Sequence, residues 1–119
     1  MSGSDTDRDS YVKGVSGMPV CEISVIPVGT GSSSISDYVV EAQRIIRKSG
    51  LKSQLGPMCT SVEGDLDKIL EVAKEIHRAC FLKGATRVLT SLKIDDRKDR
   101  PLSMDGKVRS VETKLKSGG

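Results

Sequence analysis

The stretch VCEISVIPVGTGSSSISDYVVEAQRIIR, residues 20–47, decides how the rest of the chain is interpreted. Its first part, Val20 to Ile26, is rich in β-branched residues and roughly alternates apolar with polar side chains, which predicts a strand with two different faces. Residues 27–34 then bring together proline, glycine and serine, which indicates a turn. Ser34 is a suitable cap for the helix that follows, whose apolar residues recur on one face: Tyr38, Val39, Ala42, Ile45 and Ile46.

The composition bounds the chain to one domain, because 119 residues with 36% hydrophobic side chains can bury one modest core. Residues 1–17 are poor in apolar side chains and are expected to form a disordered tail, followed by a domain over 18–116 and a short tail over 117–119. No apolar run approaches the roughly 20 residues that cross a membrane. Because the N-terminus also lacks a leader pattern, we expect no membrane partner and a cytoplasmic location.

The downstream pattern adds five further elements. Residues 52–55 and 58–63 suit a hairpin, and residues 87–94 suit a last strand. The clearest helix lies between them, with apolar side chains at three- and four-residue steps: Leu66, Ile69, Leu70, Ala73, Ile76 and Cys80. Ser103 can cap a C-terminal helix that carries Met104, Val108, Val111 and Leu115 on one stripe.

The resulting order, β-α-β-β-α-β-α, predicts an α+β fold: a ferredoxin-like βαββαβ sandwich with an additional C-terminal helix. Both inner helices should cover one face of a four-stranded antiparallel sheet, and the first and last strands should pair with the two hairpin strands. The uncovered, or open, face should then carry Glu22, Ser24 and Ile26 from the first strand and Arg87, Leu89, Ser91 and Lys93 from the last. A face of this mixed character is solvated, covered by another subunit, or a ligand site.

Several motifs together resemble one known family. They are CEISVIPVGTG at 21–31, TSVEG at 60–64, EIH at 75–77, KIDDRKDRPL at 93–102 and GKVRSV at 106–111. In this order and with nearly ungapped spacing, they resemble the thiamine-binding protein family over residues 18–116. The resemblance implies a ferredoxin-like fold, a homodimer or homotetramer, and thiamine or a related pyrimidine as the ligand of some members. No established catalytic activity comes with it.

The leading hypothesis is therefore a non-catalytic small-molecule binding protein that takes thiamine as a ligand, requires no cofactor and has an oligomer-associated site. The alternative is a structural or regulatory homo-oligomer without a bound vitamin. We expect the site at the edge of the open sheet face, with Thr30, Ser34, Thr60 and Glu63 as its polar groups. The Glu63 carboxylate can answer the amino group or the cationic ring of thiamine. The competing interpretations are a plain turn and cap for residues 29–34, and a favourable helix-dipole contact for Glu63.

Other functions are less well supported by the residues. An RNA-recognition module would need aromatic side chains on its strands, and residues 21–26 and 87–94 contain none, so no nucleic-acid partner is expected. An acylphosphatase-like enzyme would need an arginine in residues 27–35, which also contain none. The single histidine, His77, has no recognisable catalytic partner and favours a structural role. Three cysteines without CxxC spacing favour reduced thiols over a metal site or disulfide, and the charged run 95–100 favours a salt-bridged strand exit or subunit contact.

Overall fold

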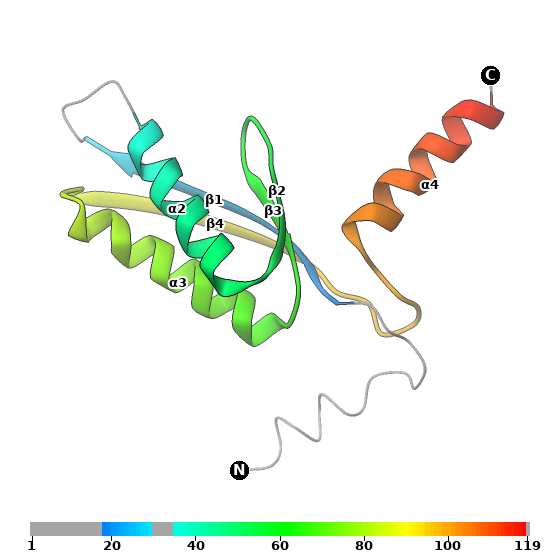
Figure 1. The fold of residues 1–119 in the computed structure, drawn as a ribbon, viewed down its shortest axis with the longest axis horizontal. Helices are drawn as coiled ribbons and strands as arrows, with labels where there is room; N and C mark the ends of the chain where they lie inside the picture. The colour runs from blue at the N-terminus through cyan, green and yellow to red at the C-terminus, as the bar shows by residue number, and fades with distance from the viewer. Residues whose placement is uncertain (1–17, 30–34, 119) are drawn as a thin grey trace, which may run out of the picture.

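The computed structural model describes residues 18–29 and 35–118, and Figure 1 shows how their elements are arranged. The predicted tail over 1–17, Thr30 and Ser34 lie outside the described residues. The α+β ferredoxin-like order with an additional C-terminal helix is confirmed. Its elements are β1 (Val20–Val28), α2 (Ser36–Ser49), β2 (Lys52–Leu55), β3 (Thr60–Glu63), α3 (Leu66–Leu82), β4 (Arg87–Asp95) and α4 (Met104–Ser117).

The four strands form one antiparallel sheet in the order β2-β3-β1-β4. β4 pairs with β1 along nine residues, from Val20↔Asp95 to Val28↔Arg87. The expectation that the last strand pairs with a hairpin strand is therefore wrong. The hairpin occupies the other side of β1, so β4 is left as an edge of the sheet.

β1 is longer than the sequence pattern predicts, since it continues through Pro27 to Val28. β3 pairs with β1 only from Val20 to Ile23, so β1 has no strand neighbour on the hairpin side beyond that point. A proline cannot donate to a ladder and is tolerated where a strand lies at a local edge. Pro27 lies beyond the part of β1 that pairs with β3, so its missing N–H removes no hydrogen bond between these two strands.

The core lies between the sheet and the layer formed by α2 and α3. The register Cys21↔Ile94 and Ile23↔Leu92 confirms the predicted division of β1 and β4 into a helix-covered face and an open face. At the far side of the core, His77 Nδ1 lies 2.6 Å from Thr90 Oγ1 and so joins α3 to β4. The fully buried side chains come from both layers: Cys21, Val62, Ile46, Ile69 and Ile76.

Helix α4 is attached mainly through its first turn and leads away from the two-layer body (Figure 1). Ser103 Oγ accepts a hydrogen bond from Gly106 N at 2.9 Å, which confirms the predicted cap. Met104 is buried, whereas the rest of the apolar stripe becomes steadily more exposed along the helix: 50% at Val108, 59% at Val111 and 69% at Leu115. Among the described residues, none buries the stripe beyond Met104.

Candidate functional site

A cavity of about 290 Å³ lies on the helix-covered side of the sheet. It is framed by α2, by the part of β1 beyond Ile23, and by the turn of the β2–β3 hairpin. Its volume is near the lower end of the roughly 300–1,000 Å³ typical of small-molecule sites. Most of the lining is apolar, including Val25, Ile26, Tyr38, Val39, Ile46 and Met58.

Two polar side chains meet at the cavity wall. Gln43 Nε2 on α2 donates to Thr60 Oγ1 on β3 at 2.9 Å, and Thr60 is only 7% exposed. In this arrangement the Thr60 hydroxyl keeps its own proton to donate, and the Gln43 side chain keeps its carbonyl oxygen to accept. The pair therefore offers a donor and an acceptor side by side to a ligand in the cavity.

An aromatic side chain also lines the cavity. Tyr38 lies in the first turn of α2 and is half-buried, and Val25 on the helix-covered face of β1 contributes to the same lining. A flat ring placed between such side chains gains apolar burial and stacking. Tyr38 belongs to the helix layer, so it lies outside the open sheet face on which the site was expected.

The cavity wall carries no formal charge among the described residues that line it. Its two cysteines are neutral thiols at physiological pH, because burial raises the pKa of both Cys59 and Cys80. At Cys59, a hydrogen bond to the Glu22 carboxylate and the negative charge of Glu22 raise the pKa further. A neutral, mostly apolar wall with one donor–acceptor pair favours an uncharged heterocyclic ring, as part of a ligand or alone, over an anion.

Of the two predicted site residues that the structure describes, Thr60 lines this cavity and Glu63 does not. Glu63 lies at the other end of the four-residue strand β3, on the opposite face of the sheet, because side chains alternate along a strand. Its Oε1 accepts a hydrogen bond from Met104 N at 2.7 Å, so Glu63 meets the N-terminus of α4. The helix that directly follows Glu63, α3, is capped instead by Asp65, whose Oδ2 accepts from Lys68 N at 3.2 Å.

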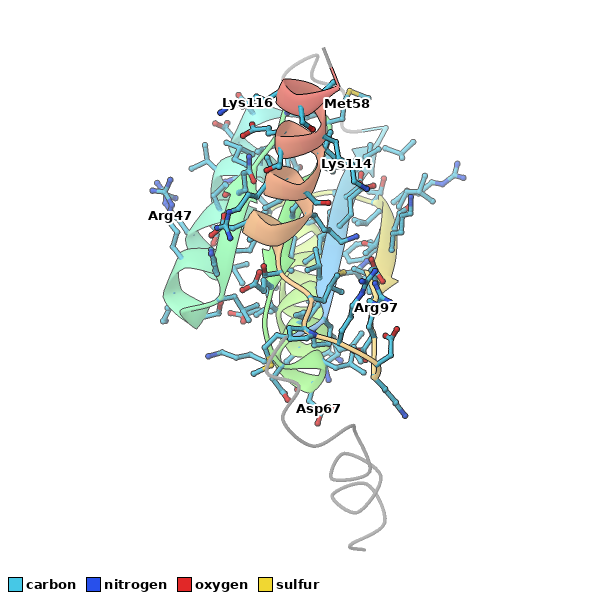
Figure 2. All side chains as sticks on the ribbon, turned by 90° about the vertical axis from the view of Figure 1, so that its right-hand side faces the viewer. Arg47, Met58, Asp67, Arg97, Lys114 and Lys116 are labelled. Carbon is cyan, nitrogen blue, oxygen red and sulfur yellow. The ribbon has the colours of Figure 1, made fainter. Side chains whose placement is uncertain are left out.

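The structure also locates the other motifs. His77, besides contacting Thr90, lies edge-on to Phe81 with ring centroids 5.4 Å apart, so both its neighbours are structural. At the strand exit, Arg97 pairs with Asp99 through bonds of 2.8 and 2.6 Å and lowers the pKa of Asp99 to about 2. Figure 2 shows Arg97 near the side of the sheet formed by β4.

In the parts of the chain with described positions, no three potential metal ligands converge. None of the described helices has the length and apolar character needed to cross a membrane.

Comparison with known proteins gives consistent results. The family described as thiamine-binding protein matches residues 21–112. A UPF0045 protein of Staphylococcus xylosus is 42% identical over 106 residues, which cover 86% of this chain and 99% of the relative. A UPF0045 protein of Bacillus subtilis is 38% identical over 82% of this chain and 98% of its own length.

Two solved structures share the fold. A hypothetical protein from Methanocaldococcus jannaschii has a TM-score of 0.75 and 39% identity over 82% of this chain and 98% of its own. A protein from Thermotoga maritima, whose name provisionally assigns it to thiamine biosynthesis or salvage, has a TM-score of 0.69 and 26% identity. It covers 78% of this chain and 97% of its own.

Proposed function

We propose, from the premise that this chain belongs to the thiamine-binding protein family, that it is a non-catalytic binding protein for thiamine or a related aminopyrimidine. The cavity framed by α2, β1 and the hairpin is the proposed site. The observation that carries the proposal is the Gln43–Thr60 pair, a donor and an acceptor fixed side by side in an apolar wall.

The chemistry of an aminopyrimidine matches this pair. Its exocyclic amino group donates and its adjacent ring nitrogen accepts, so the amino group would donate to Gln43 Oε1 while the Thr60 hydroxyl donates to the ring nitrogen. Tyr38 and Val25 would contact the faces of the ring. The proposed site thus retains Thr60, one of the residues predicted from the sequence. Gln43 and Tyr38 take the role that was expected of Glu63.

The rim of the cavity supports an oligomer-associated site. Several large apolar side chains at the rim are exposed: 43% at Ile35, 37% at Val39, 57% at Leu55 and 87% at Met58. Figure 2 labels Met58 at the top of the molecule, at the turn of the hairpin. A second subunit of a homodimer or homotetramer resting on this rim would bury these groups and close the site. The proposal places the protein in the cytoplasm, where three free cysteines stay reduced.

Titration calorimetry with thiamine, and separately with its aminopyrimidine half, tests the proposal. Gln43→Met keeps the length of the side chain but removes both hydrogen-bonding groups, and affinity should fall about fivefold to a hundredfold because the ligand's amino group loses its acceptor. Gln54→Met is the matched control, since Gln54 is exposed on β2 outside the cavity lining. Absence of heat with both ligands in the wild type would refute the proposal and favour the ligand-free structural homo-oligomer.

A further inference from the structure

The part of β1 beyond Ile23 has a neighbouring strand on one side only. β4 pairs with β1 along its whole length (Figure 1), whereas the pairing with β3 ends at Ile23↔Thr60. The lining of the cavity includes three consecutive residues of this part: Ser24, Val25 and Ile26. Because consecutive side chains point to opposite faces of a sheet, a cavity that touches all three residues reaches the edge of the strand itself.

The hydrogen bonds of β1 show which of its main-chain groups face the hairpin side. In an antiparallel sheet, the N–H and C=O of one residue point to the same neighbouring strand, and those of the next residue point to the other. Pro19 O accepts a bond at 3.2 Å from Gly64 N, directly after β3, so the groups of odd-numbered residues face the hairpin side. The unbroken register with β4 preserves this alternation through Pro27, whose missing N–H therefore removes no bond to β4.

Val25 is consequently the next position at which β1 could bond to the hairpin. The residue that would face it, Met58, lies before the start of β3 and is 87% exposed. Among the described residues, no group bonds to the N–H or C=O of Val25 on this side. A main-chain N–H needs a partner, and beside the cavity that partner is a bound ligand or water. The cavity wall therefore carries a main-chain donor whose direction is fixed by the ladder to β4.

We propose that the Val25 N–H donates a hydrogen bond to the second ring nitrogen of the aminopyrimidine, so that the site selects a pyrimidine over a ring with one nitrogen. The inference rests on the proposed function, in which the amino group and the adjacent ring nitrogen meet Gln43 and Thr60. Ile23, opposite Thr60, and Val25 lie about 7 Å apart along the strand, which leaves room for one six-membered ring between the two donors.

Proline at position 25 removes this N–H without removing a bond to β4, and Val25→Ala is the matched control because it shortens the side chain but keeps the N–H. The probes for titration calorimetry are 4-amino-2-methylpyrimidine and 2-amino-6-methylpyridine, at a pH at which both are uncharged. The pyridine keeps the amino group and the adjacent nitrogen but has C–H in place of the second nitrogen.

The wild type and Val25→Ala should prefer the pyrimidine about fivefold to a hundredfold, because the pyridine leaves the Val25 N–H without an acceptor. Val25→Pro should bind both rings about equally. The ratio of the two affinities within one variant separates the loss of the N–H from the change of side chain.

Amide hydrogen exchange on the wild-type protein tests the same group without a substitution. Without ligand, the Val25 amide should exchange about a hundredfold faster than those of Ser24 and Ile26, which bond to β4. Thiamine at about a hundred times its dissociation constant should slow the Val25 amide about a hundredfold. The Ser53 amide is the matched control, because it points to the free edge of β2 outside the cavity lining and should exchange fast throughout.

Three results would count against these expectations. Thiamine binding that leaves the Val25 amide unprotected, or the same preference for the pyrimidine in Val25→Pro as in Val25→Ala, would overturn the inference and leave the proposed function standing. A Val25 amide as protected as that of Ser24 without ligand would overturn it whichever ligand binds. Absence of binding by both thiamine and the aminopyrimidine would instead refute the proposed function, and this inference with it.

Discussion

Removing the Glu63 carboxylate should loosen helix α4 and leave the cavity unaffected. Glu63 Oε1 accepts from Met104 N at 2.7 Å, and Met104 is the first residue of α4 and the only buried one in that helix. A hydrogen bond to a charged group contributes about 1.5–3 kcal/mol. A carboxylate at a helix N-terminus gains a further ~0.3–1 kcal/mol from the dipole. Glu63→Ala removes both contributions.

Hydrogen exchange is the suitable assay. A loss of about 1.8–4 kcal/mol in the docking of α4 corresponds to about a twentyfold to nine-hundredfold faster exchange of the amides of residues 104–107, with the amides of β1 unchanged. Glu75→Ala is the control, because Glu75 is an exposed glutamate on α3. Unchanged exchange in α4 would refute the anchoring role. A selective loss of ligand affinity in Glu63→Ala, with α4 still protected, would instead return Glu63 to the ligand site.

Two further predictions concern a cap and a thiol. Asp65→Ala should destabilise the protein by ~1 kcal/mol and lower the melting temperature by about 4 °C in calorimetry, because Lys68 N loses its capping acceptor; no change would show that Asp65 does not cap α3. Glu22→Gln should lower the pKa of the Cys59 thiol toward its ordinary value, because burial and then the Glu22 hydrogen bond and charge raise it. The variant's thiolate fraction, and hence its rate with a disulfide reagent, should then rise at a lower pH than in the wild type. Coincident pH profiles would remove Glu22 from the surroundings of the thiol.

The elements were predictable because each carries its own local period. Alternation marked β1, the three- and four-residue steps marked α3, and Ser103 marked the start of α4. The neighbour of β4 was not predictable from such patterns, because strand pairing is a long-range choice. The lengths of the strands were one available clue to the pairing. β4 and β1 each span nine residues and can pair along their full length, whereas the hairpin strands span four.

The candidate cavity could be anticipated from the sequence only through one residue. Thr60 was chosen as a polar group near the end of an element, and it lines the cavity, but the expected site was on the open face. Gln43 was missed because a glutamine in an amphipathic helix is usually solvated. Its spacing from Val39 and Ile46 places it on the border of the apolar face, which was the available clue. The contact of Glu63 with α4 joins residues 41 positions apart, and no local pattern encodes that.

The unequal lengths of the strands also explain why a cavity exists in so small a domain. β3 stops opposite Ile23, while β1 continues for five residues to Val28, so the helix-covered face of β1 has no strand beside it over that part. If the hairpin strands were longer, their backbone and side chains would fill this space. Instead α2 and the hairpin turn enclose it, and Thr60, the first residue of β3, is left at its border to meet Gln43. β1 also pairs with β4 along all nine residues. The length of β1 therefore accounts both for the cavity on its hairpin side and for the length of the edge strand β4 on its other side.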